Sequence, residues 1–318
     1  MSVPAAYIGV ILIWSTTPLA IQWSGDGVGW LFGITSRMCI GVLTGIGAAL
    51  VFRISLPWHA AARRTYLAAG LGLFCAMTLV YWSARYIPSG WISVLFGIAP
   101  MVTGAMAHIW LGETALSPVR ITGLLLGVAG LAVMLVGTRT LGPGAALGIA
   151  GMLLSVTAYS ASAIAVKRIG ADIPALATTV GGLAVSMTLL LAVCVLTGEP
   201  LPAHVPRRAA LSIVYLGIVG SVLGFVMYYY VLRHVEATRV ALITLMTPVI
   251  ALLLGSGLNG EAIPAEAWVG TVTILSGLLL FEYGPRIHGW QPRLTALRIR
   301  RTPGTQRRAG AAGRQSGL

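Results

Sequence analysis

Acidic side chains are scarce in this sequence, and their positions limit the chemistry that it can support. The chain has 318 residues and only eight Asp and Glu residues. They fall in loops or near the ends of long apolar runs: Asp26, Glu113, Asp172, Glu199, Glu236, Glu261, Glu266 and Glu282. A carboxylate in the middle of an apolar segment is the usual relay for a coupled proton or cation. Because none is present, coupling through a central acid is disfavoured, and routes through Glu282 or His108 stay open.

One basic residue does lie inside an apolar run. Arg37 falls within residues 29–52, where a guanidinium costs roughly 2.5–3.5 kcal/mol on membrane-insertion scales. That cost would be offset by an anionic group on a bound molecule, by helix-end carbonyls or a carboxylate, or by snorkelling to the aqueous surface. The sequence favours a structural or snorkelling role, and Arg37 is also kept as a candidate for contact with a bound molecule.

Catalytic and nucleotide-binding motifs are absent from the sequence. It has no Walker A phosphate loop, no HExxH zinc motif and no acidic cluster of the kind that a metal-dependent membrane transferase needs. Residues 255–260 spell GSGLNG, a formal match to GxGxxG, but no strand is expected before them. The cysteines, Cys39, Cys75 and Cys194, lie in apolar runs without ligand or disulfide spacing. We therefore predict no enzyme activity, no cofactor and no metal.

Two stretches of the chain repeat each other at a constant offset. Residues 81–113 and 229–261 share four landmarks that are 148 positions apart: Tyr81 and Tyr229, Arg85 and Arg233, Pro100 and Pro248, and Glu113 and Glu261. In each copy a long apolar run has a proline near its middle and ends in Gly-Glu. A period close to half the chain indicates a doubled unit rather than a solenoid.

Apolar runs long enough to cross a membrane make up most of the sequence. The chain is 57% apolar and 9% charged, whereas soluble domains are about 25% charged. Ten runs meet the length of about 20 residues that spans a hydrocarbon core, and within lipid such runs must be helical. They are residues 5–23, 29–52, 66–86, 88–111, 118–137, 144–166, 174–197, 209–232, 237–258 and 265–284. We therefore predict an all-α integral membrane protein with ten transmembrane helices.

Basic residues set the expected orientation of these helices. Of the 21 Lys and Arg residues, Arg85, Arg139, Arg207 and Arg208 fall on one side, Arg37 falls within a span, and the other 16 fall on the side of both termini. Basic loops stay in the cytoplasm, so both termini are expected there. Each repeat holds five helices, so the two copies should run in opposite directions. The formal net charge of +13 reflects this bias and not nucleic-acid binding.

The prolines and their neighbours indicate where a central cavity would form. Broken helices at matching places in two halves point to a transport site near the bilayer midplane. Besides Arg37, the predicted lining is Trp14, Thr17, Tyr81, Ser93, Phe96, Pro100, Tyr228, Thr244 and Pro248. Two alternatives stay open, because a proline can serve only as a kink and aromatic residues near helix ends can form an interfacial belt. Glu113 and Glu261 are interpreted as structural acids, each complementing the dipole of the helix that follows it.

The chain resembles the EamA-type branch of the drug/metabolite transporter superfamily. The resemblance rests on a proline-centred run that ends in Gly-Glu and is followed by a helix with glycines seven residues apart. This unit occurs twice within the ten runs. The resemblance covers residues 5–285, and Trp14 to Pro18 and Arg37 also fit it. It implies an inner-membrane carrier built from two inverted five-helix repeats, residues 1–143 and 144–285, around a central cavity. It implies that the helices carrying the following residues line that cavity: Trp14, Tyr81, Pro100, Tyr159, Tyr228 and Pro248. It also implies small-metabolite substrates, often amino acids or related compounds and often exported.

The predicted function is therefore export or exchange of a small polar metabolite by alternating access, with the lipid bilayer and a small-molecule substrate as partners. Two alternatives stay open. A multidrug or cation efflux carrier would need an acidic cavity, and an intramembrane enzyme would need a cluster of reactive side chains.

Residues 286–318 hold eight arginines and no acid, which predicts a disordered cytoplasmic tail. Trp290, Leu294 and Leu297 would let this tail contact anionic lipid, or the tail is solvated and only fixes topology.

Overall fold

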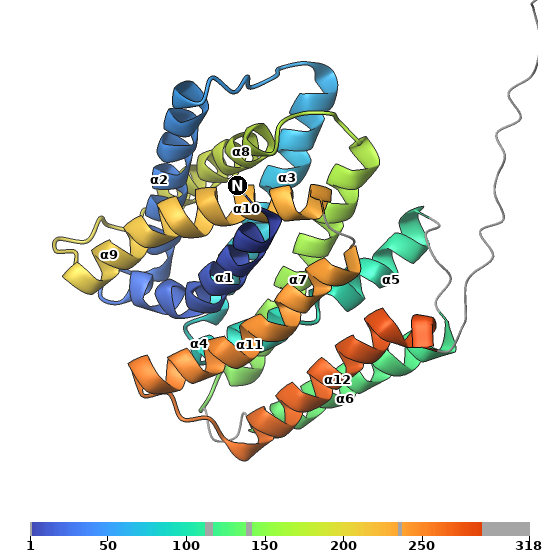
Figure 1. The fold of residues 1–318 in the computed structure, drawn as a ribbon. Coiled ribbons are helices and arrows are strands. Elements are labelled where there is room, and N and C mark those ends of the chain that lie inside the picture. Colours follow the sequence, from blue (N-terminus) through green and yellow to red (C-terminus); the bar gives the residue numbers. More distant parts are fainter. Residues whose placement is uncertain (1, 112–116, 138–141, 235–236, 288–318) are drawn as a thin grey trace, which may run out of the picture.

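Helices joined by turns and short connections form the protein in a computed structural model that describes residues 2–111, 117–137, 142–234 and 237–287. No strand occurs in these residues. Figure 1 shows the bundle that they form, with elements α1 (Val3–Gly25), α2 (Trp30–Val51), α3 (Ala60–Ser83), α4 (Ser89–Phe96), α5 (Ala99–Leu111), α6 (Pro118–Gly137), α7 (Ala145–Ile169), α8 (Ala175–Thr197), α9 (Arg207–Tyr215), the π-helix η2 (Leu216–Leu223), α10 (Gly224–His234), α11 (Ala237–Asn259) and α12 (Ala265–Ile287).

The predicted apolar runs and the observed helices coincide. Each of the ten runs falls on helix within the described residues, although the fourth run is divided into α4 and α5 and the eighth into α9, η2 and α10. In the same residues, seven helical segments are long and apolar enough to cross a membrane, and shorter apolar helices lie in α6, α11 and α12. The all-α membrane fold expected from the sequence is confirmed.

Local sequence accounts for several helix ends. Glycines with positive φ follow three helices directly: Gly170 (60°) after α7, Gly198 (62°) after α8 and Gly260 (65°) after α11. The left-handed conformation at this position stops a helix, and glycine adopts it without a Cβ penalty. Because each of these glycines ends a long apolar helix, the chain can turn sharply and return through the bundle.

Helices α6 and α12 form a closely packed pair, side by side in Figure 1. A Cβ added at Gly123 would lie 2.6 Å from the carbonyl oxygen of Gly277, and one added at Gly277 would lie 2.6 Å from that of Gly123. Gly130 and Gly270 are matched in the same way, at 2.8 Å in both directions. Such reciprocal contacts are typical of a local two-fold axis between equivalent helices. Small residues at these four positions let the two backbones touch.

A second group of helices surrounds α1, which packs against α2, α4, α9, α10 and α11. Helix α4 lies against α11, and its side chain Trp91 is 1% exposed. Tyr81 of α3, also 1% exposed, and Leu95 of α4 belong to the same buried cluster. This arrangement brings helices from both halves of the sequence together around α1, where the candidate site lies.

Candidate functional site

The two proline-bearing segments contact each other, but only one of them is broken. Helix α4 ends at Phe96, α5 begins at Ala99, and Pro100 is the second residue of α5. Helix α11 runs without interruption through Pro248. A Cβ at Gly97, in the break, would lie 3.4 Å from Cγ of Pro248. The break in one half therefore packs against the proline of the other.

The sequence predicted that both prolines would break their helices, and this prediction is wrong for α11. A proline in the first turn of a helix costs little, because the amide that it lacks would have no helical partner there. Pro100 occupies such a position, so the break falls before it and not at it. An interior proline loses one backbone bond, and a membrane helix tolerates that loss when its neighbours support it. Pro248, buried against α4, is supported in this way.

Four of the predicted site residues form an aromatic group contributed by α1, α10, α7 and α4. The ring of Trp14 lies 4.9 Å from that of Tyr228, and the ring of Phe96 lies 5.2 Å from that of Tyr159, measured between centroids. The side chains of Tyr159 and Tyr228 are hydrogen-bonded to each other. Trp14 also meets Phe225 edge to face at 6.4 Å. We call Trp14, Phe96, Tyr159 and Tyr228 the aromatic group, and it joins helices from both halves of the chain.

Arg37 of α2 is almost completely buried, with 2% of its surface exposed. Its Nε donates to Oγ of Ser221 in η2 at 2.9 Å, and its guanidinium carbon lies 6.0 Å from the centre of the Tyr81 ring. A Cβ at Gly220 would lie 3.7 Å from Nη2 of Arg37 and 3.8 Å from Oγ1 of Thr17. The snorkelling role considered from the sequence is therefore excluded, because the guanidinium is held inside the bundle.

The π-helical turn η2 explains how Arg37 obtains its partner. An α-helix makes i to i−4 bonds, and a π-helix widens the turn by one residue, a feature frequent at functional sites. Gly217 and Gly220 of η2 leave the space that the side chains of α2 fill: a Cβ at Gly217 would lie 3.2 Å from the carbonyl oxygen of Arg37. The apolar pattern of this run predicts a helix but gives no sign of the wider turn.

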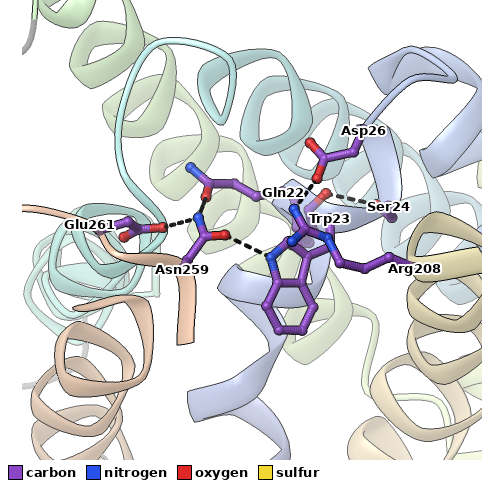
Figure 2. Close-up of polar contacts among 8 residues, drawn as sticks. Gln22, Trp23, Ser24, Asp26, Arg208, Asn259 and Glu261 are labelled. Atoms are coloured by element: carbon purple, nitrogen blue, oxygen red, sulfur yellow. Dashed lines mark hydrogen bonds and ion pairs between the residues drawn. The ribbon is translucent and has the colours of Figure 1, made fainter. Parts of the chain in front are cut away.

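Polar side chains tie the end of α1 to the residues at the end of α11 (Figure 2), and Ser89 adds the start of α4. Asn259 accepts a hydrogen bond from Nε1 of Trp23 at 2.9 Å and donates to Oε1 of Gln22 at 3.3 Å and Oε1 of Glu261 at 3.0 Å. Oγ of Ser89 donates to Oε2 of Glu261 at 3.0 Å. We call Gln22, Trp23, Ser89, Asn259 and Glu261 the interhelical polar cluster. It links the first half of the chain to the second.

An ion pair extends this cluster at the surface. Arg208, at the start of α9, pairs with Asp26 and places its guanidinium carbon 5.0 Å from the centre of the Trp23 ring. Both charged side chains are about half exposed (56% and 49%), so the pair itself contributes little to stability. It does hold the start of α9 against the end of α1, next to the polar cluster.

Glu261 acts on a helix other than the one expected. The sequence suggested that it would complement α12, which follows it. Its carboxylate instead accepts from the backbone amide of Gly90 at 3.4 Å and from Ser89, at the N-terminus of α4. The reason is the turn at Gly260, after which the amide of Glu261 bonds back to the carbonyl of Gly255 at 3.2 Å. The acid thus complements the dipole of α4 across the two halves.

Other predicted residues are distributed as follows. Ser93 is buried in α4, and Thr17 donates to the carbonyl oxygen of Ile13 at 2.7 Å in α1. Two hollows, of about 420 and 440 Å³, lie away from the aromatic group, one beside Arg64 and Arg168 and the other beside Trp82. Several predictions fall outside the described residues and side chains: Glu113, Thr244, Tyr229, Arg233, Glu236, Glu282 and the tail from residue 288.

Sequence reasoning missed Ser221 and most of the polar cluster. Gln22 and Trp23 sit at the end of an apolar run, where a polar or aromatic residue is expected for interfacial reasons alone. Asn259 falls within the formal GxGxxG match of residues 255–260, which gives no sign of its hydrogen bonds. The one available signal was the string Asn259, Gly260, Glu261, in which two polar side chains flank a turn glycine at the end of a long apolar helix.

The profile of the EamA-like transporter family matches residues 3–136 and 146–283. The chain is 25% identical over 207 residues to the uncharacterized inner membrane transporter YedA of Escherichia coli K12, a match that covers 65% of this chain and 66% of the relative, just under two thirds. It is 25% identical over 316 residues to a probable terminal-alkyne amino-acid exporter of Streptantibioticus cattleyicolor, with 98% of this chain and 97% of the relative covered.

A crystal structure of a protein with 22% sequence identity superposes with a TM-score of 0.64, covering 90% of this chain and 98% of the other. At that identity the likeness concerns the fold alone. Both relatives carry names of transport proteins, a transporter and a probable exporter. Since the family profile covers most of the sequence in two blocks, one in each half, this chain belongs to the EamA-like transporter family.

Proposed function

We propose that this protein is a secondary transporter that moves a small polar metabolite, with an amino acid or a related compound favoured, across the inner membrane by alternating access. Two observations carry the proposal: Arg37 is buried between Ser221 of η2 and the Tyr81 ring, and the aromatic group joins helices of both halves. A buried charge beside aromatic rings, placed where two repeats meet, has the composition of a site for a small polar ligand.

The interhelical polar cluster supports closure on one side. In the orientation that the Lys and Arg distribution favours, the linked ends of α1, α4 and α11 face the outside. Hydrogen bonds of this half-buried kind contribute only about 0.5–1.5 kcal/mol each, or about 1.5–3 kcal/mol where they involve the Glu261 carboxylate, because water replaces them when they open. The cluster is therefore suited to hold the two halves together on the outer side and to release them without a large barrier.

The favoured substrate class draws on the relatives. The Streptantibioticus cattleyicolor protein is named as a probable amino-acid exporter, and its match extends over nearly the whole of both chains. The aromatic group favours a second candidate, a cation efflux carrier, because aromatic faces attract cations. The fixed positive charge of Arg37 disfavours it, since a nearby like charge repels a cation in a site of low dielectric.

Counterflow in proteoliposomes tests the proposal. We expect trans-stimulated uptake of at least one labelled amino acid, with no requirement for a pH gradient because the described spans carry no central carboxylate. The panel also includes amines, sugars, organic acids and a cationic dye. Uptake of the dye alone would favour cation efflux, and uptake that depends on a proton gradient would contradict exchange without coupling. Empty liposomes and protein-free extracts are the controls.

Reporter fusions test the orientation. With both termini in the cytoplasm, green fluorescent protein fused after Leu318 is expected to fluoresce and periplasmic alkaline phosphatase at the same point is expected to stay inactive. Alkaline phosphatase inserted at Glu199, in the connection between α8 and α9, should be active. The opposite pattern at the two points would place the polar cluster on the cytoplasmic side and reverse the closure described above.

A further inference from the structure

We propose that Arg37 binds the carboxylate of the transported molecule, an inference that rests on the transport function proposed above and narrows its substrate to compounds with a free carboxylate. The starting point is a guanidinium with unused donors. Arginine carries five N–H donors, and its planar fork matches the two oxygens of a carboxylate. In this structure Nε is bonded to Ser221, while Nη1 is buried and has no hydrogen-bond partner.

No acidic side chain in the described residues neutralises this charge. Asp26 pairs with Arg208, and Glu261 is held by Ser89, Gly90 and Asn259 at the helix ends. Asp172 and Glu199 are exposed in connections between helices, and Glu266 lies in the first turn of α12. A buried cation without a counter-ion is unfavourable, because desolvation is not repaid. An anionic ligand that enters the bundle would supply the missing charge.

A second unused donor lies on the face of Arg37 that is turned toward α3. The hydroxyl of Tyr81 is buried without a hydrogen-bond partner, and its ring is the one over which the guanidinium lies. The side chains of Arg37 and Tyr81 are 2% and 1% exposed. Buried polar groups are nearly always paired, so two neighbouring exceptions indicate a ligand that completes them. Both groups can donate to one oxyanion.

The surroundings fit an amino acid with its carboxylate at Arg37. Gly220 and Gly224 of η2 and α10 have no side chains to separate the guanidinium from the aromatic group: a Cβ at Gly224 would lie 3.5 Å from Nε1 of Trp14. The faces of Trp14 and Tyr228 can take an ammonium group or an apolar side chain. A zwitterion thus finds a partner for each charge, whereas an amine without a carboxylate keeps the aromatic contact but leaves Arg37 unpaired and is repelled by it.

Competition measurements test this assignment. The probe is the labelled amino acid with the highest counterflow, competed by the same amino acid, its primary amide and its phosphonate analogue. In the wild-type protein the acid should compete roughly 10- to 100-fold better than the amide, the range expected for hydrogen bonds to a charged group. In Arg37→Gln this ratio should fall to near one, and in Arg37→Lys it should lie between.

The matched control is Arg85→Gln, which removes an exposed guanidinium in the turn that follows α3 and should keep the wild-type ratio. Size-exclusion profiles show which variants fold. If Arg37→Gln does not fold, the acid-to-amide ratios of the wild-type protein and of Arg37→Lys still test whether Arg37 binds the carboxylate. An equal affinity for acid and amide, a preference for the phosphonate, or an unchanged ratio in Arg37→Gln would overturn the carboxylate assignment alone. Absence of transport for every compound would count against the transport function itself.

Discussion

Replacing Asn259 by Ala is expected to open the side that the proposed orientation places outside, and to raise the labelling rate of a cysteine placed at position 93 by at least about tenfold. Asn259 holds Trp23, Gln22 and Glu261 at once. A hydrogen bond to a charged group contributes about 1.5–3 kcal/mol, so loss of the bond to Glu261 alone predicts a change of that order. Position 93 is buried in α4, one turn from Ser89 of the polar cluster.

The measurement uses a membrane-impermeant thiol reagent added from outside. The background replaces the three native cysteines by Ala and carries Ser93→Cys. Ser256→Ala is the matched control, because Ser256 is exposed on the same helix and lies outside the polar cluster. Glu261→Gln should act in the same direction as Asn259→Ala, since it weakens the bonds from Ser89 and Gly90. Labelling that is unchanged in both variants would show that this cluster does not close the outer side.

Gly123→Ala is expected to destabilise the protein by about 1–3 kcal/mol, the usual cost of overpacking. The new Cβ would meet the backbone of α12, at 2.6 Å from the carbonyl oxygen of Gly277 and 2.7 Å from the amide of Phe281. Backbone atoms cannot move aside as a side chain can, so the two helices must separate. The apparent melting temperature in detergent should fall by several degrees.

Gly257→Ala supplies the control, because a Cβ there would meet no atom within 4 Å. It should leave the melting temperature unchanged or raise it slightly, since alanine favours helix. The double variant Gly123→Ala and Gly277→Ala should cost less than the sum of the two single variants, because the first substitution already separates the backbones that the second would push apart. Additive effects would show that the two glycines do not share one contact.

A residue's place on a long apolar helix could be read from the sequence, but its contacts could not. Trp14, Phe96, Tyr159 and Tyr228 meet in the structure, and they were expected near a centre because they lie on long apolar helices beside prolines or in places that the family resemblance indicated. What each ring touches could not be predicted, since it depends on the tilt of four helices. The polar cluster shows the same limit: Trp23 and Asn259 are 236 residues apart and no local pattern relates them.

The sequence by itself determined the all-helical membrane fold, the number of apolar runs and the doubled organisation, because the thickness of a bilayer and the need to satisfy backbone hydrogen bonds leave few alternatives. Tertiary structure decided where the chain bends and what Arg37 contacts. The helix is interrupted before Pro100 but continues through Pro248. The reason is that packing against neighbouring helices decides whether the loss of a backbone hydrogen bond at a proline is tolerated. Ser221, which binds Arg37, lies in the π-helical turn η2, which packs against α2 and which apolar periodicity does not predict.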